Sequence, residues 1–218
     1  GFQGPANLRT LNKVLEPSDR NLQSPAMEHH NKQVEGMERM FRFLAGHHQV
    51  PTDFEDFITK GQILQAEALK TAVEHWRRRK FKTAGSIIWQ LNDCWPAISW
   101  SLIDSAGRPK AAYFYARRFF APVLVSFSEG PEGRIEVWIT NDTLMDQRGI
   151  LSLSAKSFAG AEIWKSNQVV TVDANSSKRC FSVNRATFAS VNPADHYLHS
   201  RFDVEGKQIS ENRLFFSQ

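Results

Sequence analysis

The second half of the chain changes from helix-forming sequence to short β-rich runs separated by turn residues. Apolar and polar residues alternate at Ile135, Val137 and Ile139, and the turn signal Gly130-Pro131-Glu132-Gly133 precedes that run. Such runs recur over about 95 residues, which is typical of an immunoglobulin-like β-sandwich. We therefore expect an all-β sandwich domain over residues 122–218. The expected strands are Val123–Ser128, Arg134–Asn141, Ile150–Ser157, Ile163–Val172, Arg179–Val183, His196–Val204 and Gln208–Phe216.

A long amphipathic helix is predicted after Pro51. Thr52 and Glu55 have the spacing of a capping box, in which each side chain bonds the other residue's backbone amide. Apolar residues then recur every three to four positions for roughly 28 residues, and Gly61 is a candidate for a kink. The apolar positions are Phe54, Phe57, Ile58, Leu64, Ala68, Ala72 and Trp76.

The segment Gly85–Leu91 follows this helix and is apolar on both faces, as expected for a parallel strand that is covered on each side. A second helix is announced by Asp104-Ser105 and Pro109, and it should end near Pro122. The order of helix, strand and helix predicts an α/β domain over residues 1–121. The first 49 residues are irregular and polar, with one apolar helical stretch at Met37–Leu44, and a long excursion of this kind is usually functional.

Charge and composition argue against several classes of partner. The net charge of +4 is concentrated in His75–Lys82, at the end of the predicted helix, where cations complement the helix dipole. This favours a structural role over phosphate binding, so we expect no nucleic-acid partner. We also expect no membrane span or secretory leader, because no apolar run approaches about 18 residues and no charged-then-apolar segment opens the chain.

Cofactor and metal sites are not predicted. Cys94 and Cys180 share no repeated spacing, which argues against a disulfide scaffold and a cysteine-type zinc site. The pairs His29-His30 and His47-His48 are adjacent, so their side chains diverge on a helix or strand. The sequence contains no nucleotide-binding or serine-hydrolase motif.

The densest chemistry lies at the end of the predicted strand. Trp89 is followed by Asn92, Asp93 and Trp95, and the C-terminal end of barrel strands is the active face of α/β barrels. An indole offers a flat apolar platform for the C–H face of a sugar, and amide or carboxylate groups bond its hydroxyls. These residues predict a saccharide site. The alternative is that both tryptophans fill the barrel mouth and that Asn92 or Asp93 caps a turn.

Three segments carry a family resemblance. The run GSIIWQLNDCWPAISWSLID (85–104) closely resembles the last barrel strand and following loop of the β-mannosidases of glycoside hydrolase family 2. The segments DFEDFITKGQILQAEALKTAVEHWRRR (53–79) and GRPKAAYFYARRFFAPVLVS (107–126) are similar to the last barrel helices of that family. Gly1-Phe2-Gln3-Gly4 is similar to the segment after its nucleophile strand. The resemblance covers about the first 125 residues and implies the last portion of a (β/α)8 TIM barrel.

The resemblance also implies that the chain is a piece of a larger enzyme. Family members are retaining exo-glycosidases with two carboxyl groups about 5 Å apart, and here both are expected upstream of Gly1. The resemblance therefore implies no catalytic residue in this chain, which alone should be inactive. The implied parent hydrolyses terminal β-D-mannose of a β-mannoside oligosaccharide or glycoconjugate, and the rest of that parent chain is a further partner.

The substrate-binding residues implied by the resemblance are Trp89, Asn92, Asp93, Gln3 and His30. Trp89 would form a wall of the sugar pocket. Asn92 and Asp93 would contact the sugar or hold the loop. Gln3 would orient the nucleophile strand or satisfy backbone groups, and His30 would lie near the active-site rim.

Other functions remain open from the sequence. The family also includes exo-β-glucosaminidases and β-galactosidases, and the residues that distinguish these sugars are expected on strands outside the chain. A different class of function is a non-catalytic carbohydrate-binding module, which would bind sugar on its own. The preferred linkage, the oligomeric state and the compartment are not predicted.

Overall fold

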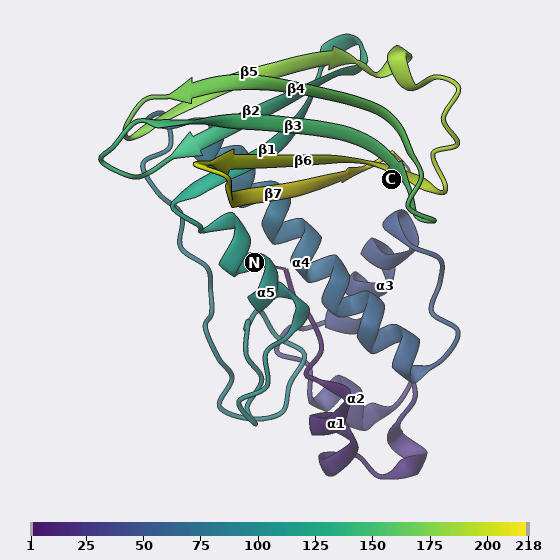
Figure 1. The fold of residues 1–218 in the computed structure, drawn as a ribbon. Coiled ribbons are helices and arrows are strands. Elements are labelled where there is room, and N and C mark those ends of the chain that lie inside the picture. The colour runs from purple at the N-terminus through teal and green to yellow at the C-terminus, as the bar shows by residue number, and fades with distance from the viewer. Residues whose placement is uncertain (1, 217–218) are drawn as a thin grey trace. The chain divides into compact units, whose positions relative to one another are not determined.

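A computed structural model describes residues 2–216 of the 218-residue chain (Figure 1). The chain divides into two compact units. The first contains the described residues as far as Ala72 together with Ile87–Arg117, and the second contains Val73–Ser86 together with the residues from Arg118 onward. The second unit therefore includes the end of the long helix and the basic segment after it. The domain boundary expected near residue 121 stays a prediction.

Helices dominate the first unit, and they enclose a core that includes Leu11, Met27, Leu44, Phe57 and Ile98. The apolar stretch at Met37–Leu44 and the long helix after Pro51 are confirmed, whereas the short helices before them were not predicted. The helices are α1 (Leu8–Val14), η1 (Pro17–Asp19), α2 (Pro25–His29), α3 (Gly36–His47), α4 (Phe54–Arg78) and α5 (Ala111–Phe119), and the last two continue into the second unit.

The start of α4 differs by one residue from the predicted capping box. Asp53 Oδ1 accepts a 2.8 Å hydrogen bond from the Asp56 amide, and Asp56 Oδ2 accepts a 3.0 Å bond from the Thr52 amide. The prediction that Thr52 and Glu55 form the box is wrong, because the carboxylate of Asp53 takes the capping position instead. Hydrogen bonds from Lys60 and then from the Thr52 amide lower the pKa of Asp56.

Gly61 does not interrupt α4, which is a single helix from Phe54 to Arg78. A Cβ atom at Gly61 would lie 2.9 Å from Cδ of Pro5 and 3.0 Å from Cε of Met40. The glycine therefore permits a close approach of α4 to its neighbours, and the expected kink is absent.

The predicted parallel strand at Gly85–Leu91 does not form in the described part of the chain. The segment is irregular, and the side chain of Ile87 is 97% exposed. A parallel strand is stable only between neighbouring strands and under helices. Both sheets among the described residues belong to the β-sandwich, so this segment has no strand beside it.

The second unit contains the seven predicted strands, each with both ends within three residues of the expected positions. All pairings are antiparallel, and Figure 1 shows the two sheets as long, twisted ribbons. One sheet has the order β1-β2-β5 and the other β4-β3-β6-β7. The strands are β1 (Val123–Gly130), β2 (Arg134–Asn141), β3 (Gln147–Ser157), β4 (Glu162–Val172), β5 (Ser176–Asn184), β6 (His196–Val204) and β7 (Lys207–Phe215).

Apolar residues from alternate strand positions form the core of the sandwich. Ile135, Val137 and Ile139 of β2 are fully buried with Leu151 and Phe202 from the other sheet. This burial explains the alternation in the sequence, because successive side chains of a strand point to opposite faces.

Two side chains of β7 bond the backbone of β1 and thereby connect the two sheets. Ser210 Oγ accepts a 3.0 Å hydrogen bond from the Val125 amide, and Asn212 Nδ2 donates a 2.8 Å bond to the Val125 carbonyl. Edge strands carry unpaired backbone groups that promote association. These contacts satisfy both backbone groups of Val125 at the edge of the three-stranded sheet.

The basic segment forms ion pairs within the second unit. Arg77 lies 2.8 Å from Asp142, and Lys80 contacts the other oxygen of the same carboxylate. Arg77 also donates to the Phe119 carbonyl, and Glu74 accepts a 2.7 Å bond from Asn212. These contacts support the structural interpretation of the basic cluster.

Within the described residues, no helix is both long and apolar enough to cross a bilayer. The same residues contain no group of three or more histidine, cysteine or acidic side chains placed to hold a metal ion.

Substitution of Gly149 by Ala should destabilise the sandwich. A Cβ atom there would lie 2.1 Å from the backbone oxygen of Asp203 in the paired strand β6, so the strands must separate. We expect the free energy of unfolding, measured by urea titration, to fall by about 1 to 3 kcal/mol. Gly130→Ala is the matched control, because its Cβ would meet only ordinary contacts at 3.6 Å or more. Equal stability of the two variants would contradict this packing.

Candidate functional site

Three segments that are far apart in sequence meet in the first unit. The amide of Gly4 donates to the Ser99 carbonyl at 2.8 Å, and the Ser99 amide returns a 3.1 Å bond to Gly4. On the other side, the Ile98 amide donates to the His30 carbonyl at 2.8 Å, and the Lys32 amide donates to the Ile98 carbonyl at 3.0 Å. The loop around Ile98 and Ser99 therefore connects the start of the chain to the segment after α2.

Gln3 and His30, which were predicted separately, lie on these two flanking segments. Gln3 is buried, and its Nε2 donates to Asn31 Oδ1 at 3.0 Å and to the Ile98 carbonyl at 3.4 Å. His30 Nδ1 lies 2.6 Å from the Pro96 carbonyl. These contacts support the alternative in which Gln3 satisfies backbone groups, and they place His30 against the predicted sugar-binding loop.

Trp95 packs against basic and aromatic side chains. Its indole stacks on the His30 ring with centroids 4.8 Å apart, and His29 meets it edge-on at 5.8 Å. The Lys32 ammonium lies 5.8 Å from the indole centroid. Because the His30 ring occupies one face of the indole, the geometry favours a packing role for Trp95 over that of an open sugar platform.

Asp93 is buried and bound by hydroxyl groups. Its Oδ2 accepts bonds from Ser99 Oγ at 2.6 Å and Ser101 Oγ at 2.5 Å, while Oδ1 accepts a 3.1 Å bond from Gln90 Nε2. A carboxylate with these donors is already satisfied without a ligand. The arrangement supports the loop-holding alternative for Asp93.

Lys110, at the start of α5, completes this cluster and was not predicted. Its side chain is fully buried, and its Nζ lies 2.9 Å from the Gly4 carbonyl and 3.8 Å from Asp93 Oδ2. Burial lowers the pKa of Lys110 to about 8, and the negative charges of Asp93 and Asp104 partly oppose this shift. The sequence feature that could have indicated this burial is the position of Lys110 directly before the apolar pair Ala111 and Ala112.

A second buried carboxylate fixes the turn before α5. Asp104 Oδ2 accepts a 2.6 Å bond from Thr10 Oγ1 and a 3.2 Å bond from the Asn7 amide, at the start of α1. Its Oδ1 accepts from the amides of Ala106 and Arg108 at 3.0 and 2.9 Å. This side chain joins the turn to α1, so both buried acids of the loop have structural partners.

Trp89 and Asn92 lie on the exposed side of the loop. The Trp89 side chain is 68% exposed, and Asn92 Nδ2 donates a 3.4 Å bond to the Asp93 carbonyl. The backbone beside Trp89 is fixed, because the Leu102 amide donates to the Gln90 carbonyl at 3.1 Å. This geometry presents an indole surface next to an anchored backbone.

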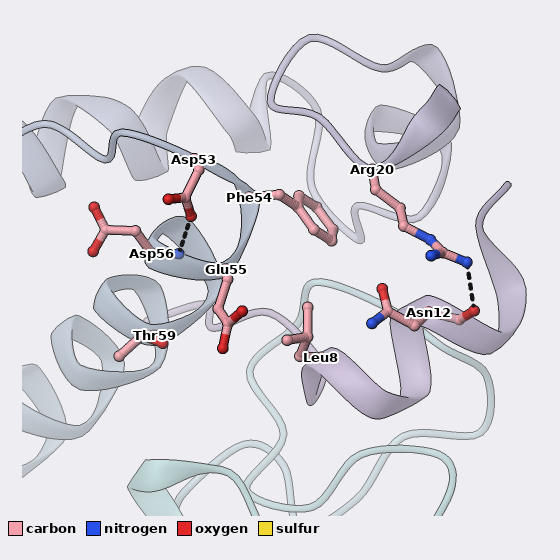
Figure 2. A pocket seen from close by; sticks show the side chains of 8 residues that line it. All are labelled: Leu8, Asn12, Arg20, Asp53, Phe54, Glu55, Asp56 and Thr59. Atoms are coloured by element: carbon pink, nitrogen blue, oxygen red, sulfur yellow. Dashed lines mark hydrogen bonds between the residues drawn. The ribbon is translucent and has the colours of Figure 1, made fainter. Parts of the chain in front are cut away.

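A separate hollow of about 660 Å³ lies between α1 and the start of α4 (Figure 2). Figure 2 shows Glu55 and Asn12 on opposite sides of it, with the Arg20 guanidinium bonded to the Asn12 carbonyl. No predicted site residue lines this hollow. Its lining residues are Leu8, Asn12, Arg20, Asp53, Phe54, Glu55, Asp56 and Thr59.

Comparison with known proteins shows similarity in sequence and fold to β-mannosidases. Residues 133–218 match the Mannosidase Ig/CBM-like domain family. A solved β-D-mannosidase from Dictyoglomus thermophilum is 35% identical, with a TM-score of 0.91 over 100% of this chain and 26% of its own. Beta-mannosidase B of Aspergillus clavatus is 26% identical over 97% of this chain and 27% of its own length.

A third similarity concerns the fold alone. The exo-chitosanase of Amycolatopsis orientalis has a TM-score of 0.80 at 18% identity, over 98% of this chain and 26% of its own. The chain thus spans about a quarter of the length of each of these three proteins.

Substitution of Asp104 by Ala should destabilise the first unit. The change leaves the Thr10 hydroxyl and several backbone amides without their acceptor in a buried place. We expect the free energy of unfolding to fall by about 2 to 3 kcal/mol, measured by urea titration. Glu16→Ala removes an exposed carboxylate that makes no capping bond and should change it by less than about 0.5 kcal/mol. A similar loss in both variants would contradict the role given to Asp104.

Proposed function

We propose that this chain, whose sequence and fold match the C-terminal region of the β-mannosidases of glycoside hydrolase family 2, is part of a retaining exo-β-mannosidase. The parent enzyme would remove terminal β-D-mannose from an oligosaccharide or glycoconjugate. The observation that carries this proposal is the match to the Dictyoglomus thermophilum β-D-mannosidase, at 35% identity and a TM-score of 0.91 over the whole chain.

Trp89 is the sugar-contacting residue in this proposal. Its indole is 68% exposed, and the backbone of the adjacent Gln90 is bonded to Trp100 and Leu102. An exposed indole on a fixed backbone suits stacking against the C–H face of a sugar, because little conformational freedom is lost on binding. Asn92 is also exposed and can bond a hydroxyl group beside that platform.

The catalytic carboxyl groups are assigned to residues outside this chain. A retaining glycosidase needs one carboxylate free to attack the anomeric carbon and a second group to protonate the leaving oxygen. Asp93 and Asp104 are buried and bound by two or more donors each, so neither suits attack. The expected nucleophile precedes Gly1, which itself lies outside the described residues.

Gln3 and His30 have supporting roles in the proposal. Gln3 fixes the segment next to the expected nucleophile by bonding Asn31 and the Ile98 carbonyl. His30 stacks on Trp95 and contacts the Pro96 carbonyl, which stabilises the rim of the loop. Both residues would therefore affect sugar binding indirectly, by fixing the position of the segments that they contact.

A non-catalytic carbohydrate-binding role is the second candidate. It is favoured by the match of residues 133–218 to the Mannosidase Ig/CBM-like domain family. A related enzyme with another sugar preference is a third candidate, since the exo-chitosanase shares the fold. Kinetics of the parent enzyme on matched β-mannoside, β-glucosaminide and β-galactoside substrates distinguish the sugars.

Trp89→Ala in the parent enzyme should lower kcat/KM for a β-mannoside by roughly 30- to 1,000-fold. This corresponds to a loss of about 2 to 4 kcal/mol in transition-state binding, from the removal of an apolar platform of about 150 to 250 Å². Trp89→Phe should recover part of the loss, because a smaller ring remains.

The matched control is Trp138→Ala in β2 of the sandwich, where the indole donates a 3.0 Å bond to Glu136. This variant should keep kcat/KM near the wild-type value. Near-normal kcat/KM for a folded Trp89→Ala enzyme would assign Trp89 to packing. An equal loss in Trp138→Ala would mean that stability, and not sugar contact, is being measured.

The 218-residue chain alone should neither hydrolyse a β-mannoside nor show saturable binding of mannose or manno-oligosaccharides in the millimolar range. An incomplete pocket lacks most of the groups that orient a sugar, and the entropy cost of association is then not offset. Isothermal titration calorimetry and release of nitrophenol from a nitrophenyl β-mannoside check these two expectations. Saturable binding without hydrolysis would favour the binding module instead, and hydrolysis would overturn the assignment of the carboxylates.

A further inference from the structure

We propose that Lys110 is a positioning residue whose buried contacts with Asp93 and Gly4 hold the loop that carries Trp89 against the first residues of the chain. The link from loop position to sugar binding rests on the proposed function. The contact between the loop and the first residues is a property of the folded chain, so it can be tested without an activity assay.

The cluster around Lys110 is fully enclosed. The side chains of Lys110 and Asp93 both have 0% exposure, and Ser99 and Ser101 are buried beside them. Lys110 Nζ donates to the Gly4 carbonyl at 2.9 Å and lies 3.4 Å from Ser99 Oγ. Ser99 and Ser101 both donate to the same oxygen of Asp93. One ammonium group therefore contacts two separate segments through a continuous set of hydrogen bonds.

The cluster is connected directly to the proposed sugar-contacting residue. Gln90 follows Trp89 in the chain, and its Nε2 donates to Asp93 Oδ1 at 3.1 Å. On the opposite side, Gly4 follows Gln3, and the Gly4 backbone is paired with Ser99 in both directions. A shift of Asp93 or Lys110 would therefore change the distance between Trp89 and the start of the chain.

A buried lysine is a costly way to stabilise a fold. Removing an ammonium group from water is energetically unfavourable, and well-packed apolar residues often replace a buried ion pair without loss of stability. The cost here is evident in the pKa of Lys110, which burial lowers to about 8. A lysine at this place is better explained by its ability to bond several oxygens from different segments at once.

Because burial lowers the pKa of Lys110, its contribution to stability depends on pH. Asp93 and Asp104 are the two carboxylates whose charges act on Lys110. Below about pH 8 the amine is charged in both the folded and the unfolded chain. Between about 8 and its ordinary value of 10.5, the unfolded chain binds more protons at this residue, so the contribution of Lys110 to stability rises with pH. Over the same interval the folded cluster loses its attraction between ammonium and carboxylate.

Lys110→Met in the 218-residue chain tests whether Lys110 keeps the loop against the first residues. The variant removes the donor to Gly4 and keeps a similar length of apolar side chain. We expect the amides of Gly4 and Ser99 to lose at least about tenfold in hydrogen-exchange protection at pH 7. Lys60→Met is the matched control, since Lys60 pairs with Asp56 on α4 and is absent from the cluster. Unchanged protection in a folded Lys110→Met chain would overturn the proposal.

Asp93→Asn provides the second variant, which keeps an oxygen acceptor for the two serines. Loss of the Asp93 charge should lower the pKa of Lys110 further, because that charge raises it. The rise that Lys110 contributes should then begin at a lower pH, so the stability difference between Asp93→Asn and the wild-type chain, followed by urea titration between about pH 6 and 10.5, should change with pH. An identical pH dependence in the two chains would contradict the coupling of Asp93 and Lys110. This test does not require Lys110→Met to fold.

The parent enzyme tests the consequence for function. Lys110→Met should lower kcat/KM by about 10- to 100-fold, the effect of a small misplacement of binding groups, and Lys60→Met should leave it unchanged. One outcome is that exchange protection in Lys110→Met falls as expected while kcat/KM stays unchanged. Lys110 would then hold the loop without affecting sugar binding, and the functional part of the proposal would be overturned. If the parent enzyme lacks mannosidase activity but the exchange result holds, the proposed function fails and the positioning of the loop stands.

Discussion

The buried ammonium group of Lys110 bonds backbone from distant segments of the first unit, in which no sheet forms among the described residues. The loop after Trp89 and the first residues of the chain pair only through isolated bridges, such as that between Gly4 and Ser99. Lys110 bonds the Gly4 carbonyl at the start of the chain, and its partner Asp93 bonds Ser99 in the loop. The first unit thus has an apolar core among its helices, and at this loop it uses charged and hydroxyl groups where a complete sheet would use a hydrogen-bonded ladder.

The sandwich depends on a different physical principle. Its interior is apolar, with Ile135, Val137 and Ile139 facing Leu151 and Leu153 across the two sheets. At its edge, the polar side chains of Ser210 and Asn212 bond the backbone of β1. Apolar burial of this kind is non-directional and proportional to area, so it is encoded by the pattern of residue types along each strand.

This difference explains which features the sequence predicted. The seven strands were predicted to within a few residues because period-two alternation is local to each strand. The strand at Gly85–Leu91 was predicted wrongly because a parallel strand depends on neighbours that no local pattern reveals. The capping box failed by one residue because Asp53 competes with Thr52 for the same role.

For the candidate site, the sequence indicated residue types but not the contacts between them. Trp89, Asn92 and Asp93 were chosen for their chemistry, and Gln3 and His30 by resemblance, but no spacing indicated that Asp93 would be enclosed by Ser99 and Ser101. Lys110 was missed because a lysine near a helix start is usually exposed. Only the contacts between distant segments, such as Lys110 with Gly4, connect it to the loop after Trp89.

A crystal structure of the parent enzyme with a mannose-derived inhibitor tests the assignment of Trp89 most directly. The indole of Trp89 should lie within about 4.5 Å of the C–H face of the sugar, while Asp93 remains bonded to Ser99 and Ser101. A sugar hydroxyl bonded to Asp93, or a sugar bound away from Trp89, would contradict the assignment.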